Sequence, residues 1–599
     1  MRFTTVSGAA LTAASAVMAK EMPKNEAKAA ELYDSGVIHN ESMQRKIALW
    51  SAEADAGLLD STKWPRLNNT VKCVNGYADA IPGDPLHKFA CKNIDLYDFI
   101  NHATLGSPNG WDELGDGVLL TGSSSWGWTD PESGREFIAN GMYDGTAFIE
   151  ILPEGRMLPI GFLPCPAPTD PNAFWKEIRS YKHYMVIGSE LRNHGIQIFD
   201  MKKLLDIDVT KGVVTYDIVK DVTGHFKDLP IGRSHNVVVH EAKDLLLAVG
   251  SAPRATDPCR AGPIFIDLKD PSKPTRLGCN PDDGYVHDAQ CLVYKGPDTR
   301  FTGRDICYGY NEDSLTIYDA TNPANSSIIS ITSYEGATYT HQGWVLDPEW
   351  QEYLVMDDEL DELRGNGPAK DGFPVTYIWD IKDLTAPKQT GLYKGSVRAV
   401  DHNQYIKDGL IYQSNYQAGL RIYDVTSIPE NPTGDDVCEI AYFDVYPQDD
   451  AEPGGGIADY AFGTWSSYGM FKSGFIFINT IERGAFLVKM SRRASCPKTH
   501  ACNADNCLRA MRSTSVSGRL EESQEFCSGF LDGWSADVAE VPEYASKACG
   551  VNVISRVSSA CSCLPTATSS VAVPSSTSPV TTTSAAPEPT ESEEYCIED

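Results

Sequence analysis

The sequence predicts an all-β fold, most simply a β-propeller with one repeat in each blade. Between Gly284 and Val425 one sequence pattern, here called the His-to-Asp phrase, recurs three times: a His in a short polar turn, a run of alternating hydrophobic residues, and a strand end of the form aliphatic-aromatic-Asp. The hydrophobic residues of this phrase alternate with the two-residue period of a β-strand, and they do not show the spacing of three or four residues that is typical of a helix. Its three copies begin at His287, His341 and His402 and end at Asp319, Asp380 and Asp424.

Strand ends of this kind occur seven times along the chain, 44 to 67 residues apart. Four-stranded blades repeat about every 40 to 50 residues, so the spacing fits blades with longer loops in some of them. Seven ends favour seven blades, and six blades are the alternative if the first or last end belongs to a strand that completes the ring. A β-sandwich would show the same alternation but would not repeat the His-to-Asp phrase. The ends are Phe148-Ile149-Glu150, Ile198-Phe199-Asp200, Phe265-Ile266-Asp267, Ile317-Tyr318-Asp319, Ile378-Trp379-Asp380, Ile422-Tyr423-Asp424 and Phe486-Leu487-Val488.

Composition divides the chain into five regions. A small-residue apolar run follows Arg2 and ends in Val17-Met18-Ala19, the pattern of a signal peptide with its cleavage site. The next region is rich in Ala, Lys and Glu, and we expect one helix in it, from Glu41 to Ala56. No later stretch has the 18 apolar residues that a membrane span requires, so we expect a soluble mature protein. The expected regions are a signal peptide over 1–19, an N-terminal arm or pro-segment over 20–95, the propeller over 96–490, a small Cys-rich module over 491–565, and a disordered Ser/Thr/Pro-rich tail over 566–599.

Sixteen cysteines in a chain that begins like a secreted protein predict a disulfide framework. Eight lie in the body and eight behind it, which suits two separate closed sets of bridges. None has the CxxC spacing of a zinc site. The strand pattern favours two pairs, Cys291 with Cys307 and Cys259 with Cys279. Glycan acceptor sequons begin at Asn40, Asn68 and Asn325.

The formal net charge of −31 argues against nucleic-acid binding, because that function needs a basic face to neutralise phosphates. Motifs for nucleophilic catalysis or for cradling a phosphate are also missing: Gly188-Ser189-Glu190 lacks the flanking glycines and following helix of a nucleophile elbow. The sequence therefore assigns no catalytic residue and leaves open whether the protein is an enzyme.

Four histidines are the strongest candidates for a binding site. Each follows a turn and precedes Asn, Asp or Gln, at what would be the same place in four blades. If that place lines the central channel, four imidazoles converge, as a bound transition metal requires. The alternative is structural, since a His near a blade start can hydrogen-bond a neighbouring strand and fix the turn. The four are His235, His287, His341 and His402.

An acidic run supplies a second candidate site, for calcium, because oxygen-rich clusters can hold this ion. The EF-hand spacing with its central Gly is absent, and a solvated loop is the alternative. The candidate ligands are Asp357, Asp358, Glu359 and Asp361.

Several consecutive motifs resemble one family. The phrases HDAQCLVY at His287, NEDSLTIYDAT at Asn311, YTHQGW at Tyr339, DDELDE at Asp357 and AVDHNQYIKDGLIYQSNYQAGLRIYDV at Ala399 are similar to the choice-of-anchor B family, built of LVIVD-type repeats. The resemblance covers about Leu96 to Val488 and implies a secreted or surface-displayed β-propeller without an established activity. The Cys-rich, Ser/Thr-rich tail resembles fungal secreted members described as regulatory P domain-containing proteins. The resemblance carries no catalytic residues.

Two functions of different classes follow. The leading hypothesis is an extracellular binding or scaffold propeller that presents its channel mouth and loops to a glycan, a peptide or a small ligand. The alternative is a metal-dependent propeller enzyme, of oxidase or lyase type, that uses the His cluster. A third, structural hypothesis is a cell-wall component held by its tail. The sequence indicates neither the ligand nor the oligomeric state.

Overall fold

The computed structural model describes residues 37–107, 122–170, 173–252, 254, 256–494, 496, 505–513, 515–532, 538–550 and 553–564. These residues belong to one compact unit, which ends at Leu564. The expected signal peptide over 1–19 and the tail over 566–599 lie outside the described residues.

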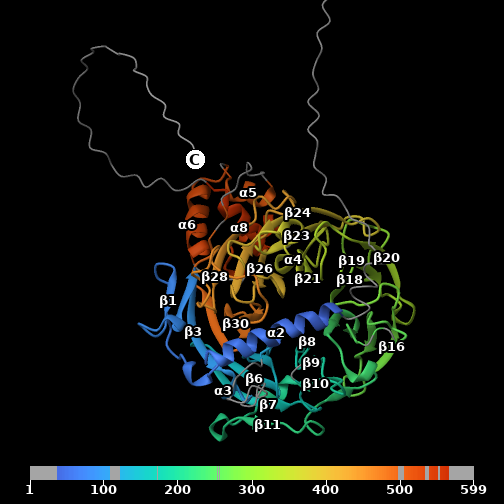
Figure 1. Cartoon of the computed structure of the whole chain (residues 1–599). Helices are drawn as coiled ribbons and strands as arrows, with labels where there is room; N and C mark the ends of the chain where they lie inside the picture. The colour runs from blue at the N-terminus through green and yellow to red at the C-terminus, as the bar shows by residue number, and fades with distance from the viewer. Residues whose placement is uncertain are drawn as a thin grey trace, which may run out of the picture. The chain divides into compact units, whose positions relative to one another are not determined.

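Seven antiparallel sheets form the seven blades of a β-propeller, as the seven repeated strand ends predicted (Figure 1). The first strands of successive blades lie side by side and surround the centre. Blade 1 contains β4 (Ser125–Thr129), β5 (Glu136–Met142), β6 (Gly145–Leu152) and β7 (Arg156–Pro164), with β11 (Val214–Thr215) added in parallel. Blade 2 contains β8 (Lys176–Tyr181), β9 (Tyr184–Ser189), β10 (Ile196–Asp200) and β12 (Gly224–Phe226). Blade 3 contains β13 (Asn236–His240), β14 (Leu245–Val249), β15 (Ile264–Asp267) and β16 (Thr275–Cys279).

The remaining four blades complete the ring. Blade 4 contains β17 (Asp288–Val293), β18 (Asp305–Asn311), β19 (Ser314–Asp319) and β20 (Ser327–Thr332). Blade 5 contains β21 (Thr340–Val345), β22 (Tyr353–Asp358), β23 (Val375–Asp380) and β24 (Lys388–Lys394). Blade 6 contains β25 (Gln404–Lys407), β26 (Leu410–Ser414), β27 (Leu420–Asp424) and β28 (Cys438–Phe443), extended by β2 (Lys88–Lys92) and β1 (Tyr77–Asp79). Blade 7 contains β29 (Thr464–Tyr468), β30 (Phe475–Thr480), β31 (Gly484–Met490) and β3 (Ile94–Asn101).

The repeated Asp of the strand ends has a local structural role. All seven ends lie on the third strand of a blade, and in five of them the Asp carboxylate accepts a hydrogen bond from the backbone N–H two residues further on, at 2.8–3.0 Å. This bond closes a turn that directs the chain out of the third strand. The five residues are Asp200, Asp267, Asp319, Asp380 and Asp424.

Strand β3 closes the ring. The predicted propeller begins at residue 96, and its first strand, over Leu96-Tyr97-Asp98-Phe99, belongs to the last blade and not to the first. The segment pairs antiparallel with β31 and forms the outer strand of blade 7, where Phe99 contacts Phe486 at 4.6 Å between ring centroids. Ring closure requires strands from both ends of the chain to share one sheet, and alternation within a single strand does not reveal its partner.

The region before the propeller begins with α2 (Val37–Asp55), close to the helix expected from Glu41 to Ala56. Its buried residues recur three or four positions apart, the stripe of a helix with one packed face. That face packs against aromatic residues at the centre of the ring, so α2 lies across the propeller (Figure 1). Trp50 is fully buried, and its indole N–H donates to the Ala461 carbonyl at 2.7 Å. The stripe comprises Met43, Lys46, Trp50 and Ala54.

A small helical module follows the propeller. It consists of α5 (Asn506–Met511), α6 (Arg519–Asp532), α7 (Glu543–Cys549) and α8 (Val553–Ser562), packed around two disulfides, Cys507–Cys549 and Cys527–Cys561. The shorter elements are α3 (His102–Leu105), α4 (Asp361–Arg364) and the 3-10 helices η2 (Ser61–Lys63), η3 (Pro85–His87), η5 (Met201–Leu204), η6 (Val209–Lys211), η7 (Pro230–Gly232), η8 (Glu241–Lys243), η9 (Pro323–Asn325), η10 (Gly367–Ala369) and η11 (Val538–Glu540).

Both disulfides favoured from the strand pattern are present: Cys259 bonds Cys279, and Cys291 bonds Cys307 across the neighbouring strands β17 and β18. A third bridge, Cys73–Cys91, fastens the segment before the propeller. The expectation of two separate closed sets is wrong, because Cys438 of blade 6 bonds Cys496 beyond the propeller. Among the described cysteines, this bridge leaves Cys165 as the free thiol.

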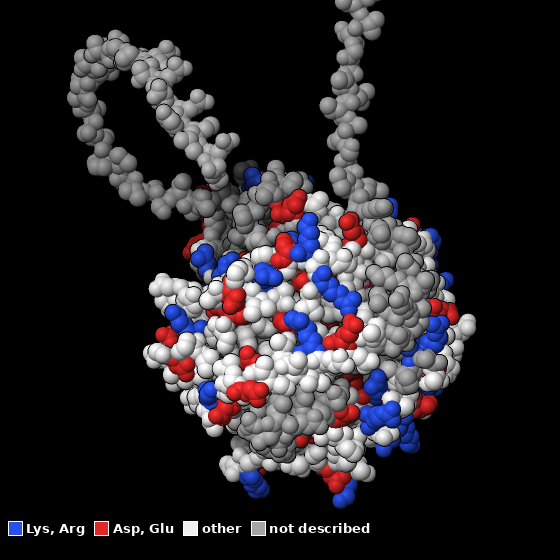
Figure 2. All heavy atoms as spheres, viewed as in Figure 1, with Lys and Arg blue, Asp and Glu red and all other residues white. Residues whose placement is uncertain are grey.

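Acidic and basic side chains are interspersed on the face shown in Figure 2. Among the described helices, none combines the length and the apolar composition needed to cross a membrane.

We predict that His102 makes stability depend on pH. Its ring is fully buried, Nε2–H donates to the Thr480 carbonyl at 2.9 Å, and burial lowers its pKa to about 4. As pH falls from 6.5 towards 4, the unfolded chain takes up this proton before the folded chain does, so the free energy of unfolding decreases. The variant His102→Gln keeps an N–H donor but does not titrate. Its free energy of unfolding should therefore change less steeply with pH between 6.5 and 4, by about 1.4 kcal/mol per pH unit. Denaturant titrations at several pH values measure the pH dependence for the wild type and for the variant. If the two proteins differ in slope as much near pH 8 as between pH 6.5 and 4, His102 is not the cause.

We also predict that Trp50 holds α2 on the propeller. Trp50→Ala removes a buried indole, a loss of about 3–5 kcal/mol. Because α2 contacts the ring only through one face, the loss should appear as faster amide hydrogen exchange within α2, with the blade strands unchanged. The exposed Gln44 of the same helix supplies the control Gln44→Ala. Equal loss of protection in helix and blades would show instead that α2 and the ring unfold together.

Candidate metal site at the channel mouth

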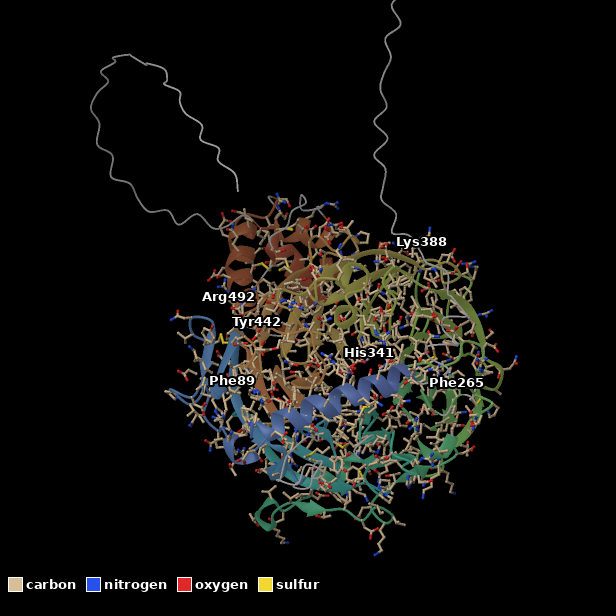
Figure 3. All side chains as sticks on the ribbon, viewed as in Figure 1. Phe89, Phe265, His341, Lys388, Tyr442 and Arg492 are labelled. Carbon is tan, nitrogen blue, oxygen red and sulfur yellow. A yellow bond between two sulfur atoms is a disulfide. The ribbon has the colours of Figure 1, made fainter. Side chains whose placement is uncertain are left out.

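Four histidines from four consecutive blades meet at the centre of the ring, a place we call the channel mouth. His235, His287 and His402 lie just before the first strands of their blades, and their backbone N–H groups donate to the second strands at 2.9–3.0 Å. His341 is the second residue of β21, and Figure 3 shows it beside α2 near the centre of the ring. Neighbouring imidazole centroids are 4.1–4.4 Å apart. The repeat therefore brings together all four residues singled out in the sequence.

In each of these imidazoles, Nδ1 faces an oxygen acceptor of the protein. Carbonyl and carboxylate oxygens accept hydrogen bonds, so Nδ1 carries a proton, and in a neutral ring Nε2 keeps the lone pair. Such outer contacts are the usual way in which a protein orients a metal-binding His. The acceptors are Glu190 Oε1 for His235 (2.6 Å), the His341 carbonyl for His287 (2.8 Å), Asp357 Oδ1 for His341 (3.2 Å) and the Trp465 carbonyl for His402 (2.6 Å).

Glu359 adds a carboxylate to the cluster. His287, His341 and Glu359 each offer one ligand atom, and these three atoms lie within 4.8 Å of one another, as a group that could hold one metal ion does. The other two histidines flank this group. His235 Nε2 is 2.7 Å from His287 Nε2, and His402 Nε2 is 3.9 Å from Glu359 Oε1.

Burial sets the protonation of these rings. It lowers the pKa of His287, His341 and His402 well below the ordinary value, so these imidazoles are neutral at neutral pH. Burial also opposes a charge on His235, but the adjacent Glu190 carboxylate outweighs this effect and raises its pKa. A protonated His235 can donate to His287 Nε2, which explains the close approach of the two Nε2 atoms.

The carboxylates of the acidic run, the candidate calcium ligands, accept hydrogen bonds from different partners. Asp357 Oδ1 also accepts from the Gln342 N–H at 2.7 Å, and Asp361 accepts from the Tyr377 hydroxyl at 2.7 Å. Asp358 accepts from Tyr334 and from three backbone N–H groups. These three side chains are fully buried, which excludes the solvated loop that the sequence allowed. Glu359 alone reaches the histidines as a ligand, and Asp357 orients His341.

Helix α2 covers the channel mouth. Ile38, Ser42, Met43 and Lys46 line the same small cavity as three of the histidines, His235, His287 and His402, and this cavity has a volume of only about 50 Å³. A larger cavity of about 630 Å³ lies elsewhere, between Trp350 of blade 5 and Ala560 of α8. The larger cavity contains none of the clustered histidines, so its size does not make it the site of metal chemistry.

Sequence reasoning missed three parts of the site. Glu190 and Trp175 belong to blade 2, which lacks the His phrase, and Lys46 comes from the segment expected to be an arm or pro-segment. The position of Trp175 in its blade could have indicated its role, because it directly precedes β8 as His235 directly precedes β13. The sequon residues Asn40, Asn68 and Asn325 are all exposed and lie outside this site.

Comparisons with known proteins add little to this geometry. No family model matches the chain, and no curated protein matches its sequence. Among solved structures, the computationally designed Ika8 protein is 8% identical, with 61% of this chain and 82% of that chain covered and a TM-score of 0.34. A protein from Lactobacillus plantarum is 12% identical, with 60% and 89% covered and a TM-score of 0.35. These scores are too low to carry an argument, so the fold rests on the seven sheets themselves.

Proposed function

We propose that this chain is an extracellular β-propeller that binds one transition-metal ion at its channel mouth. His287, His341 and Glu359 supply the ligands, and His235 and His402 stand beside them. The observation that carries the proposal is the orientation of the imidazoles: each Nδ1 is held by an oxygen acceptor, which leaves Nε2 as the donor atom.

The donor set limits the metal and its chemistry. Two imidazoles and one carboxylate suit zinc, iron or copper better than calcium or magnesium, which prefer oxygen ligands. Three protein ligands also leave a coordination position open, as metals that bind a substrate require. A metal-dependent enzyme of oxidase or lyase type is therefore the second candidate, and it would use the same open position.

The location follows from the covalent framework. The many disulfides are consistent with an extracellular protein, because such bonds persist in oxidising compartments. We further propose that residues 1–19 direct secretion and that Asn40, Asn68 and Asn325 carry glycans. We also propose that the chain belongs to the choice-of-anchor B family in its fungal secreted form. A glycan, a peptide or a small molecule is the expected ligand, and retention in a cell wall through residues 566–599 is the expected anchoring.

Elemental analysis of the secreted, untagged protein tests the metal site. We expect about one equivalent of a transition metal in the wild type and its loss in His341→Ala and Glu359→Gln. Asp357→Asn replaces the carboxylate that orients His341 with a neutral amide, a weaker acceptor, so it should weaken the affinity about 10- to 100-fold. The half-exposed His183, which lies outside the cluster, supplies the control His183→Ala, which should keep the metal.

Thermal unfolding with and without a chelator completes this experiment. A bound metal should raise the melting temperature of the wild type and of His183→Ala, but not that of His341→Ala. A protein that holds no metal when transition-metal salts are supplied, or variants that bind it as tightly as the wild type, would contradict the proposal and make the histidines structural.

A further inference from the structure

Lys46 places its ammonium group in the middle of four aromatic rings. Nζ lies 4.7–5.5 Å from the four ring centroids, within the range of a cation–π interaction. The side chain is only 5% exposed, although a Lys on a helix ordinarily extends its charge into water. The four rings are those of Trp175, Tyr416, Tyr460 and Trp465, and we call them the aromatic cage.

The cage is built by the propeller and not by α2. Trp175 and Trp465 stack on each other with centroids 4.1 Å apart and an interplanar angle of 15°. The Tyr416 hydroxyl donates to Glu359, and the Tyr416 carbonyl accepts from the Thr464 N–H at 2.7 Å. Tyr416 has a φ of 38°, a region that bulky residues rarely adopt, so this ring is held in place at a conformational cost. Trp175, Trp465 and Tyr416 are therefore held by contacts within the propeller, and Tyr460 also contacts Ser42 of α2.

Negative charge also surrounds the cage. Glu359, Asp459 and Glu190 act electrostatically on the Lys46 ammonium, and they partly offset the burial that lowers its pKa. Asp459 is ion-paired with Arg45 of the same helix, next to Lys46 in the sequence. Aromatic faces together with carboxylates are the surroundings that favour an alkylammonium group over a neutral group of the same size.

We propose that the channel mouth is a binding site for an alkylammonium group, and that Lys46 of α2 occupies this site as an internal competitor. The natural ligand carries a primary or a quaternary ammonium group, and it enters the cage when α2 moves away. This inference goes beyond the proposed metal site, because none of the four rings is a metal ligand. It stands even if the protein holds no metal.

Calorimetric titration of the full-length, chelator-treated Lys46→Ala variant tests the proposal. Three probes are compared: n-butylammonium, which matches a lysine side chain, tetramethylammonium, which matches a quaternary headgroup, and the neutral 1-butanol. We expect at least one cation to bind about tenfold more tightly than 1-butanol, and the stronger cation identifies the type of headgroup. The wild type and the control Gln44→Ala should bind both cations about tenfold more weakly than Lys46→Ala, because Lys46 fills their cage.

The rings are then removed from the Lys46→Ala background. Trp465→Leu should abolish the preference for the cation, and Tyr460→Leu provides a second test if the first variant fails to fold. The proposal is overturned if 1-butanol binds as tightly as both cations, or if a folded variant without one of these rings binds them as Lys46→Ala does. Since all samples are free of metal, failure here leaves the metal site untouched, and failure of the metal site leaves this result untouched.

Discussion

The first strands of seven blades converge on one narrow space, and the arrangement of the channel mouth depends on this constraint. A residue type that recurs at the start of these strands meets its copies from neighbouring blades, whatever their separation in the sequence. Here the copies are flat rings that follow one another around the centre, tilted by 39–59°, with neighbouring centroids 4.1–4.7 Å apart along the run from His235 to Trp465, and Trp465 then stacks on Trp175. The order around the ring is Trp175, His235, His287, His341, His402 and Trp465.

Packing alone would not hold polar rings in so dry a place. Each imidazole has one nitrogen satisfied by a fixed acceptor, because an unpaired buried polar group costs about 1–3 kcal/mol. The second nitrogen cannot be satisfied in the same way at every position, since the rings face one another. A ring of imidazoles at a propeller centre is therefore incomplete by itself: it needs either a shared proton, as between His235 and His287, or a cation.

The sequence was sufficient for the fold because strand ends and turns are local. The Asp of each repeated end binds the backbone two residues away, so its position is visible in the sequence. The four histidines were found for the same reason, since they repeat with the blades. Glu359 was assigned to calcium with its acidic neighbours, because a run of carboxylates does not reveal which side chain turns towards the histidines. Ring closure by β3 and the entry of Lys46 both depend on contacts across more than 300 residues, which no local pattern encodes.

The two cation sites of the channel mouth are coupled through one carboxylate. Glu359 is one of the proposed metal ligands, accepts the hydrogen bond of Tyr416, and acts electrostatically on Lys46. In a cavity of about 50 Å³, a divalent ion and the Lys46 ammonium would repel each other and compete for the charge of Glu359. A metal at the histidines would therefore weaken the hold of the cage on Lys46, and docking of α2 would weaken the affinity for the metal. If both proposals hold, metal binding and helix docking oppose each other.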